Sequence, residues 1–219
     1  MVTATRRGKL TIYLGYAPGV GKTYRMLSDA RYLHEHGSHV VIGHMAHGRT
    51  AIDAQKKSLE ELPYRAINYR GIAMTEMDTD AIIARYPSLV LIDELAHTNV
   101  PGSKYEKRYQ DVAEILDAGI PVATTLNIQH IESIAKKVEI MLGMRVRERV
   151  PEQVIADADR IIVVDLDVAH LIDRIRTGKV YCSRHQAQVA LEHFFKEKNL
   201  TWLRKVTFLE AASLLEYHR

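Results

Sequence analysis

The stretch GKLTIYLGYAPGVGKTYRML, residues 8–27, joins a short apolar run to a glycine-rich turn and then to a helical pattern. The run Leu10–Leu14 predicts a buried strand, and the apolar spacing after Thr23 predicts a helix. A turn that leaves a strand and enters a helix can aim backbone N–H groups and the positive helix end at a phosphate. The stretch therefore predicts a phosphate-binding loop.

The rest of the chain repeats this alternation of strand and helix patterns. Helical spacing recurs between the apolar runs, for example at Val112, Ile115 and Leu116. Such alternation predicts an α/β fold of the P-loop NTPase-like kind, with a mostly parallel sheet covered by helices. The expected strands are residues 10–14, 39–43, 65–69, 89–93, 121–126 and 160–165.

No repeat, low-complexity tract or Pro/Gly/Ser-rich linker divides the 219 residues, so we expect a single domain over 1–219. Its α/β core is expected to run from about residue 8 to about residue 165. The segment from about 166 to 219 predicts a helical appendage of two or three helices, with breaks near Gly178 and Asn199.

The composition is that of a folded globular protein, with 47% hydrophobic and 26% charged residues. The 30 basic residues exceed the 27 acidic ones by only three, and no basic stripe stands out, so nucleic-acid binding is not expected. The sequence contains neither a secretory signal nor an apolar run of ~20 residues, and Cys182 is its only cysteine. We therefore expect no membrane segment in this chain and a reducing, cytoplasmic location.

One segment of the loop carries the residue types that a nucleotide phosphate needs. Glycines permit the tight turn, and the backbone between them forms the cradle. The lysine would reach the β- and γ-phosphates of ATP, and the threonine hydroxyl would hold Mg²⁺. The predicted nucleotide-binding residues of this segment are Gly19, Val20, Gly21, Lys22 and Thr23.

The start of the loop departs from the usual spacing. The strict motif has a glycine at position 16, whereas this chain has Gly15 followed by Tyr16. The alternative interpretation is an ordinary strand-to-helix turn with its lysine in solvent.

A second apolar run, SLVLIDELAHTN, ends in Asp93 and Glu94. A buried strand that delivers two carboxylates at its end needs a reason, because unpaired buried charges are costly, and Mg²⁺ is such a reason. In phosphoryl-transfer sites of this type an aspartate binds the metal and a neighbouring residue orients the attacking water. We predict Thr23 and Asp93 as Mg²⁺ ligands and Glu94 as the candidate catalytic residue. The alternative is that both carboxylates cap a helix.

Two further polar segments follow the predicted strands. Asn127, in TTLNIQHIES, stands where a γ-phosphate sensor would lie in an open α/β sheet, although it would equally well cap the next helix. The loop after Glu94 carries Lys104, Lys107 and Arg108, whose charges could neutralise phosphate. For each of these three we favour a solvated surface position.

Together these motifs resemble the N-terminal domain of the KdpD sensor histidine kinase family. The resemblance runs from about Gly8 to Arg204, and the family likewise carries the first glycine one position early. The chain departs from the family at Met45, where an acidic residue is usual, and at Asp167-Val168, where a proline pair is usual. The matching segments are the loop, HGR at 47–49, LVLIDELAHTNVPGS, KRYQDVAEILDAGI, TTLNIQHIES, VRERVP, and GKVY followed by EHFFKEKNLTWLR.

The resemblance implies an ATP-binding cytoplasmic domain that modulates the kinase and phosphatase output of a two-component potassium and osmotic sensor. The sequence contains no phosphoacceptor histidine box and no kinase ATP-binding domain. We therefore expect it to act on sensor histidine kinase domains or another signalling protein, with oligomerisation left open. The segment 93–103 is expected to carry the signal, and weak ATPase activity fits this interpretation.

Two other functions are compatible with the same scaffold. One is a small-molecule kinase or ATPase, for which Arg145, Arg147 and Arg149 would supply lid arginines. The other is a nucleic-acid motor, against which the nearly balanced charge argues.

Overall fold

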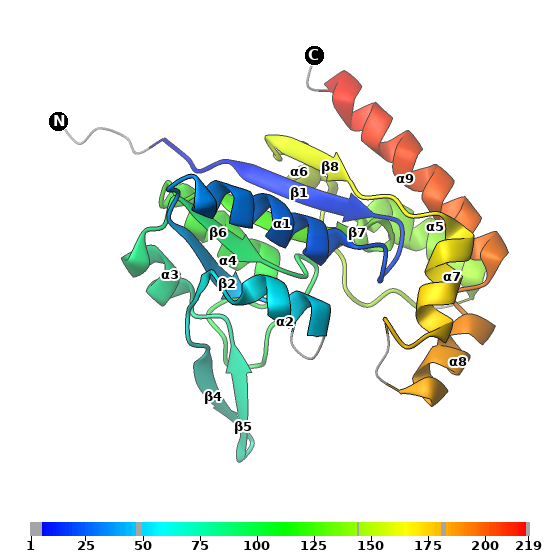
Figure 1. Ribbon diagram of the computed structural model, residues 1–219, viewed down its shortest axis with the longest axis horizontal. Coiled ribbons are helices and arrows are strands. Elements are labelled where there is room, and N and C mark those ends of the chain that lie inside the picture. The colour runs from blue at the N-terminus through cyan, green and yellow to red at the C-terminus, as the bar shows by residue number, and fades with distance from the viewer. Residues whose placement is uncertain (1–5, 47–49, 144, 181–182, 218–219) are drawn as a thin grey trace.

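A six-stranded sheet forms the centre of the protein (Figure 1). The computed structural model describes residues 6–46, 50–143, 145–180 and 183–217, so Cys182 and the HGR motif at 47–49 lie outside the described residues. The sheet has the order β3-β2-β6-β7-β1-β8, and every pair of neighbours in it is parallel, which confirms the predicted α/β class. Its strands are β1 (Leu10–Gly15), β2 (Val40–His44), β3 (Glu60–Glu61), β6 (Leu89–Ile92), β7 (Val122–Asn127) and β8 (Arg160–Val163).

The predicted strand at 65–69 forms, but its expected place in the parallel sheet is wrong. It is β4 (Arg65–Tyr69) and pairs antiparallel with β5 (Ile72–Glu76) in a hairpin that projects from the sheet (Figure 1). The two turn residues, Arg70 and Gly71, have φ of 53° and 81°, the conformation that closes a two-residue hairpin. The sixth place in the main sheet belongs to β3, whose two residues are both exposed and carry no apolar pattern.

Helices cover both faces of the sheet, as predicted. Because alternate residues of a strand point to opposite faces, Ile12 and Leu14 enter one hydrophobic cluster and Tyr13 enters the other. Helices α1 and α2 pack in the cluster of Tyr13, whereas α3, α4 and α5 supply residues to that of Ile12. The bounds are α1 (Lys22–Glu35), α2 (Thr50–Lys56), α3 (Thr79–Arg85), α4 (Arg108–Asp117), α5 (Glu132–Leu142) and α6 (Glu152–Ala156).

The segment after β8 is helical, as predicted for the appendage. It forms α7 (Val168–Arg176), α8 (Arg184–Glu192) and α9 (Glu197–Tyr217). The break near Gly178 is confirmed, with a φ of 75° at that glycine. The second break lies between α8 and α9 at residues 193–196, slightly before the predicted position, because Asn199 lies in the first turn of α9 and its Nδ2 donates to the carbonyl oxygen of His193 (3.0 Å). Within the described residues, no helix combines the length and apolar character needed to cross a membrane.

Candidate functional site

The carboxyl ends of β1, β6 and β7 meet at one edge of the sheet. Strand β7 lies between the other two, and the register sets Gly15 beside Asn127 and Ile92 beside Thr124. This register gathers the three predicted segments around a single cavity of about 280 Å³. Ligands of open α/β sheets bind at this end of the strands. The predicted site residues that line the cavity are Gly19, Gly21, Lys22, Thr23, Asp93, Glu94 and Asn127.

The loop needs its glycines for two different reasons. Gly19 and Gly21 have φ of 89° and 106°, which is the left-handed region that glycine adopts without strain. At Gly15 the reason is space, because a Cβ there would lie 2.6 Å from Val20 Cγ2 and 3.0 Å from Lys22 Cδ. The predicted residue Val20 is 4% exposed and belongs to the core, so only its backbone is available to a ligand.

Tyr16 explains how the loop accommodates the shifted glycine. Its side chain is 1% exposed, and its hydroxyl donates to the carbonyl oxygen of Leu166 at 2.8 Å. Burial raises the pKa of this hydroxyl well above its usual range. Tyr16 thus anchors the start of the loop to the segment that follows β8. The residue that lies close to the Lys22 side chain is Gly15, one position earlier.

Lys22 is turned inward, so the solvent-facing alternative for this lysine is wrong. Its side chain is buried, and Nζ donates to the carbonyl oxygen of Ala17 at 3.0 Å and to Oδ1 of Asn127. Asn127 precedes the short helical turn Ile128–His130, yet its side chain forms no capping hydrogen bond. The amide therefore faces the lysine and the cavity rather than the next turn.

Asp93 and Thr23 bring oxygen atoms together across the cavity floor. Thr23 Oγ1 lies 3.2 Å from Oδ1 and 3.1 Å from Oδ2 of Asp93, which is 3% exposed. Thr125 also donates to Asp93 Oδ1, and its hydroxyl accepts the Glu94 amide at 3.1 Å. The helix-cap alternative is wrong, because the next helix, α4, begins only at Arg108.

Glu94 lines the cavity next to Asp93. Its backbone has a φ of 60°, a conformation that costs a non-glycine residue roughly 1–2 kcal/mol. Partial removal from water raises the pKa of the Glu94 carboxyl, and the negative charge of Asp93 raises it further. Because 56% of the side chain is exposed, water limits the size of this effect.

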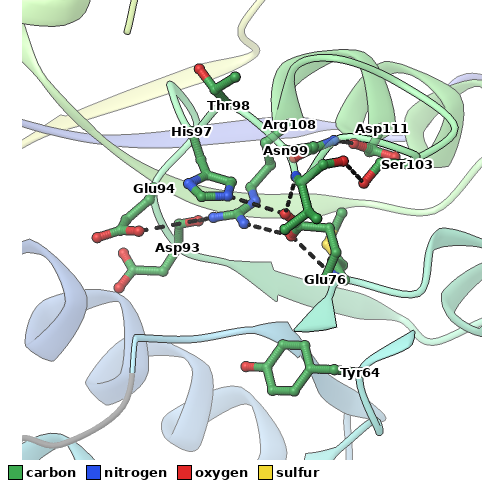
Figure 2. Close-up of polar contacts among 12 residues, drawn as sticks. Tyr64, Glu76, Asp93, Glu94, His97, Thr98, Asn99, Ser103, Arg108 and Asp111 are labelled. Carbon is green, nitrogen blue, oxygen red and sulfur yellow. Dashed lines mark hydrogen bonds and ion pairs between the residues drawn. The ribbon is translucent and has the colours of Figure 1, made fainter. Parts of the chain in front are cut away.

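The expected surface position of Arg108 is wrong, since its side chain is completely buried. Figure 2 shows its guanidinium between Glu76 and Asp93. Nη2 donates to Glu76 Oε1 at 2.8 Å, and Nη1 donates to the Asp93 carbonyl oxygen at 3.1 Å. The sequence does indicate this burial, because Arg108 precedes Val112 and Ile115 by four and seven residues and so shares their buried face of α4.

Glu76 is the centre of this buried network, and sequence reasoning missed it. Its Oε2 lies 3.1 Å from His97 Nε2 and accepts the Val100 amide at 3.2 Å (Figure 2). Burial alone would raise the pKa of Glu76, but the hydrogen bond from His97 and the charge of Arg108 outweigh it, so the pKa lies well below the usual range. The hairpin β4–β5 thereby braces the loop that carries Asp93.

The other predicted cations do not appear among the described residues that line the cavity. Lys104 is exposed and pairs with Glu114, as expected for a surface residue. The described residues that line the cavity include none of Arg145, Arg147 and Arg149, and Arg149 donates instead to Glu139 at 2.8 Å. The cavity lining also includes titratable residues that were not predicted, among them His130, Glu148, Arg174 and Lys179.

The two departures from the family pattern both have structural roles. Met45 is 0% exposed and packs in the cluster beneath α1 and α2. Asp167 caps α7 by accepting the Ala169 amide at 2.9 Å, and Val168 is 8% exposed. Neither Met45 nor Asp167 lines the cavity as the described residues outline it.

Comparison with known proteins identifies close relatives. The family model for KdpD, described as the osmosensitive K⁺ channel His kinase sensor domain, matches residues 6–215. A KdpD-named sensor protein of Synechocystis sp. is 48% identical over 212 residues, covering 96% of this chain and 57% of that protein. The sensor proteins KdpD of Mycobacterium tuberculosis and Escherichia coli K12 are 45% and 44% identical over 94% and 97% of this chain. This chain spans only 24% of each of these two proteins.

Proposed function

The chain belongs to the KdpD sensor-domain family, and from this premise we propose that it binds ATP with Mg²⁺ as a regulatory domain of a two-component potassium sensor. Its relatives are longer sensor proteins, so the proposed partner is the kinase part of such a protein on the cytoplasmic side. Nucleotide occupancy would bias that kinase between its kinase and phosphatase states. A ligand shifts such an equilibrium only by its differential affinity for the two states.

The observation that carries the proposal is the meeting of Lys22, Thr23 and Asp93 at one cavity. Gly21 directly precedes α1, so the first amides of this helix and its positive end face a bound phosphate. The ammonium of Lys22 adds a full charge at the same place. These donors suit the polyphosphate of a nucleotide better than an uncharged ligand.

The residues on the cavity floor also fit Mg²⁺. Neighbouring oxygen ligands of an octahedral Mg²⁺, with bonds of 2.0–2.1 Å, lie ~2.9 Å apart. Thr23 Oγ1 and the Asp93 carboxylate oxygens, 3.1 and 3.2 Å apart, match this spacing after a small adjustment. A bound Mg²⁺ would neutralise phosphate charge. Thr23 and Asp93 would orient the phosphates relative to Lys22 through it.

Slow ATP hydrolysis is a second candidate activity, favoured by Glu94. Its carboxyl lines the cavity next to Asp93, and its raised pKa brings it closer to the range of a general base. Glu94→Gln would then abolish phosphate release and leave ATP binding unchanged.

Calorimetric titration with MgATP tests the proposal. Lys22→Ala removes a charge-assisted contact worth about 1.5–3 kcal/mol, so affinity should fall at least about tenfold. Lys57→Ala, at an exposed position of the same charge, is the matched control and should bind as the wild type does. Asp93→Asn should weaken the Mg²⁺ dependence while preserving the side-chain volume. A folded Lys22→Ala variant with wild-type affinity for MgATP would refute the proposal.

A further inference from the structure

The C-terminal segment packs directly on the phosphate loop. A Cβ at Gly19 would lie 2.6 Å from Val180 Cγ2 and 3.1 Å from Leu171 Cδ1, and both of these side chains are buried. Gly19 therefore provides the close approach between the loop and this segment. Leu171 and Arg174 are three residues apart on α7, so they lie on the same face of the helix. The face that covers the loop thus also carries a cation.

Two cations of this segment reach the nucleotide cavity. Arg174 and Lys179 line it together with Lys22 and Thr23. Arg174 Nε is buried without a hydrogen-bond partner, and no described acidic side chain forms an ion pair with either cation. Elsewhere Arg85 and Arg204 are paired with carboxylates. A buried donor left unpaired costs free energy, which an anion in the cavity would recover.

The acidic residues among the described residues that line the cavity already have other partners. Asp93 accepts hydrogen bonds from Thr23 and Thr125, Glu94 pairs with Arg108 at 4.0 Å, and Glu148 accepts the Thr98 amide at 3.2 Å. The two unpaired cations are therefore available to a ligand rather than to the protein. Their charge and their position beside the loop favour a polyphosphate.

We propose that Arg174 and Lys179 bind the terminal phosphates of the nucleotide, so that α7 closes the site and responds to its occupancy. This inference rests on the proposed ATP binding. The guanidinium offers planar paired donors that match phosphate oxygens, and the lysine adds a point charge. Because ATP has one phosphate more than ADP, removing Arg174 affects ATP more than ADP.

A purely structural role for Arg174 makes a different prediction. A cation in the last turn of a helix is stabilised by the negative helix end, whatever the ligand. Arg176 occupies the same last turn, but it is exposed and does not appear among the described residues that line the cavity. Residues two apart do not share a helix face. Arg176→Ala is therefore a control with the same change of charge on the same helix.

The test is calorimetric titration of the full chain with MgATP and with MgADP. Arg174→Ala should weaken MgATP binding roughly ten- to a hundredfold, the size expected for a lost charge-assisted hydrogen bond, and MgADP binding by less. Arg174→Lys should retain part of the affinity, and Arg176→Ala should stay within about twofold of the wild type. If Arg174→Ala fails to fold, the MgATP affinities of Arg174→Lys and Arg176→Ala are compared instead. The proposal requires Arg174→Lys to bind MgATP more weakly than Arg176→Ala, and equal affinities would overturn it.

Amide hydrogen exchange supplies a second readout. MgATP should slow exchange in residues 168–176 of the wild type and of Arg176→Ala, but not of Arg174→Ala. If the wild type binds MgATP and the two alanine variants match it in affinity and exchange, this inference is wrong and the proposed function stands. If the folded wild type does not bind MgATP, both are wrong.

Discussion

Glu76→Ala should destabilise the protein strongly, because it leaves a charge buried without its partner. The Glu76 side chain is 5% exposed, and that of Arg108 is 0% exposed. Removing the carboxylate leaves the guanidinium with the Asp93 carbonyl oxygen at 3.1 Å and the half-exposed Glu94 carboxylate at 4.0 Å, and also frees the Met77 and Val100 amides. Breaking a buried pair in this way costs about 3–5 kcal/mol. For a chain of this size that lowers the Tm by roughly 6–20 °C.

Thermal unfolding followed by circular dichroism measures this effect. Glu60→Ala is the matched control, because Glu60 also pairs with an arginine, Arg85 at 2.8 Å, but at the exposed surface. Its loss should lower the Tm far less. The double variant Glu76→Leu/Arg108→Met, which removes both charges, should recover most of the lost stability. Equal Tm values for Glu76→Ala and Glu60→Ala would refute the reasoning.

The pH dependence gives the same prediction a second check. The pKa of Glu76 is lowered by folding, so its carboxylate stabilises the protein fully above the ordinary glutamate pKa of 4.5. That contribution is lost as the pH falls below this value. The difference in unfolding free energy between wild type and Glu76→Ala should therefore shrink on acidification, and a difference that grows would contradict the assignment.

Two smaller predictions concern the loop and the cavity wall. Gly15→Ala places a Cβ 2.6 Å from Val20 Cγ2, so overpacking should lower the free energy of unfolding by about 1–3 kcal/mol. The variant should also bind MgATP more weakly, because the new Cβ would displace Lys22. An unchanged Tm and an unchanged affinity would show that the loop adjusts freely. Burial lowers the pKa of His130 below 6.5, so the wild type should lose stability as the pH falls below about 6.5, whereas His130→Gln should lose less. Urea unfolding between about pH 5 and 8 measures this, and parallel profiles for the two proteins would exclude His130 as the cause.

The sequence predicted the parts of the fold and site that local patterns encode. Lys22 and Asp93 each follow an apolar strand, and the parallel register then brings them together without further information. Strand β3 was not predicted, because its two residues are exposed glutamates and show no alternation of apolar and polar side chains. Arg108 was misplaced because charge was weighed above its helical spacing from Val112. Arg174 was missed because only the packing of α7 on Gly19 brings it to the loop.

The two walls of the cavity are held by different forces, and this difference predicts which wall would respond to the proposed nucleotide. The wall that carries Asp93 is fixed by the buried pair of Glu76 and Arg108, so moving it would cost several kcal/mol. The wall formed by α7 is held to the loop by apolar contacts of Leu171 and Val180. Phosphate contacts would add to that wall only when a nucleotide is bound, which is the differential affinity that a switch requires. Helix α7 contacts α8 and α9, and α9 packs against β1 and β8. The segment 93–103, expected from the sequence to carry the signal, is the braced side of the cavity, and under the proposed nucleotide binding we expect α7 to move against it.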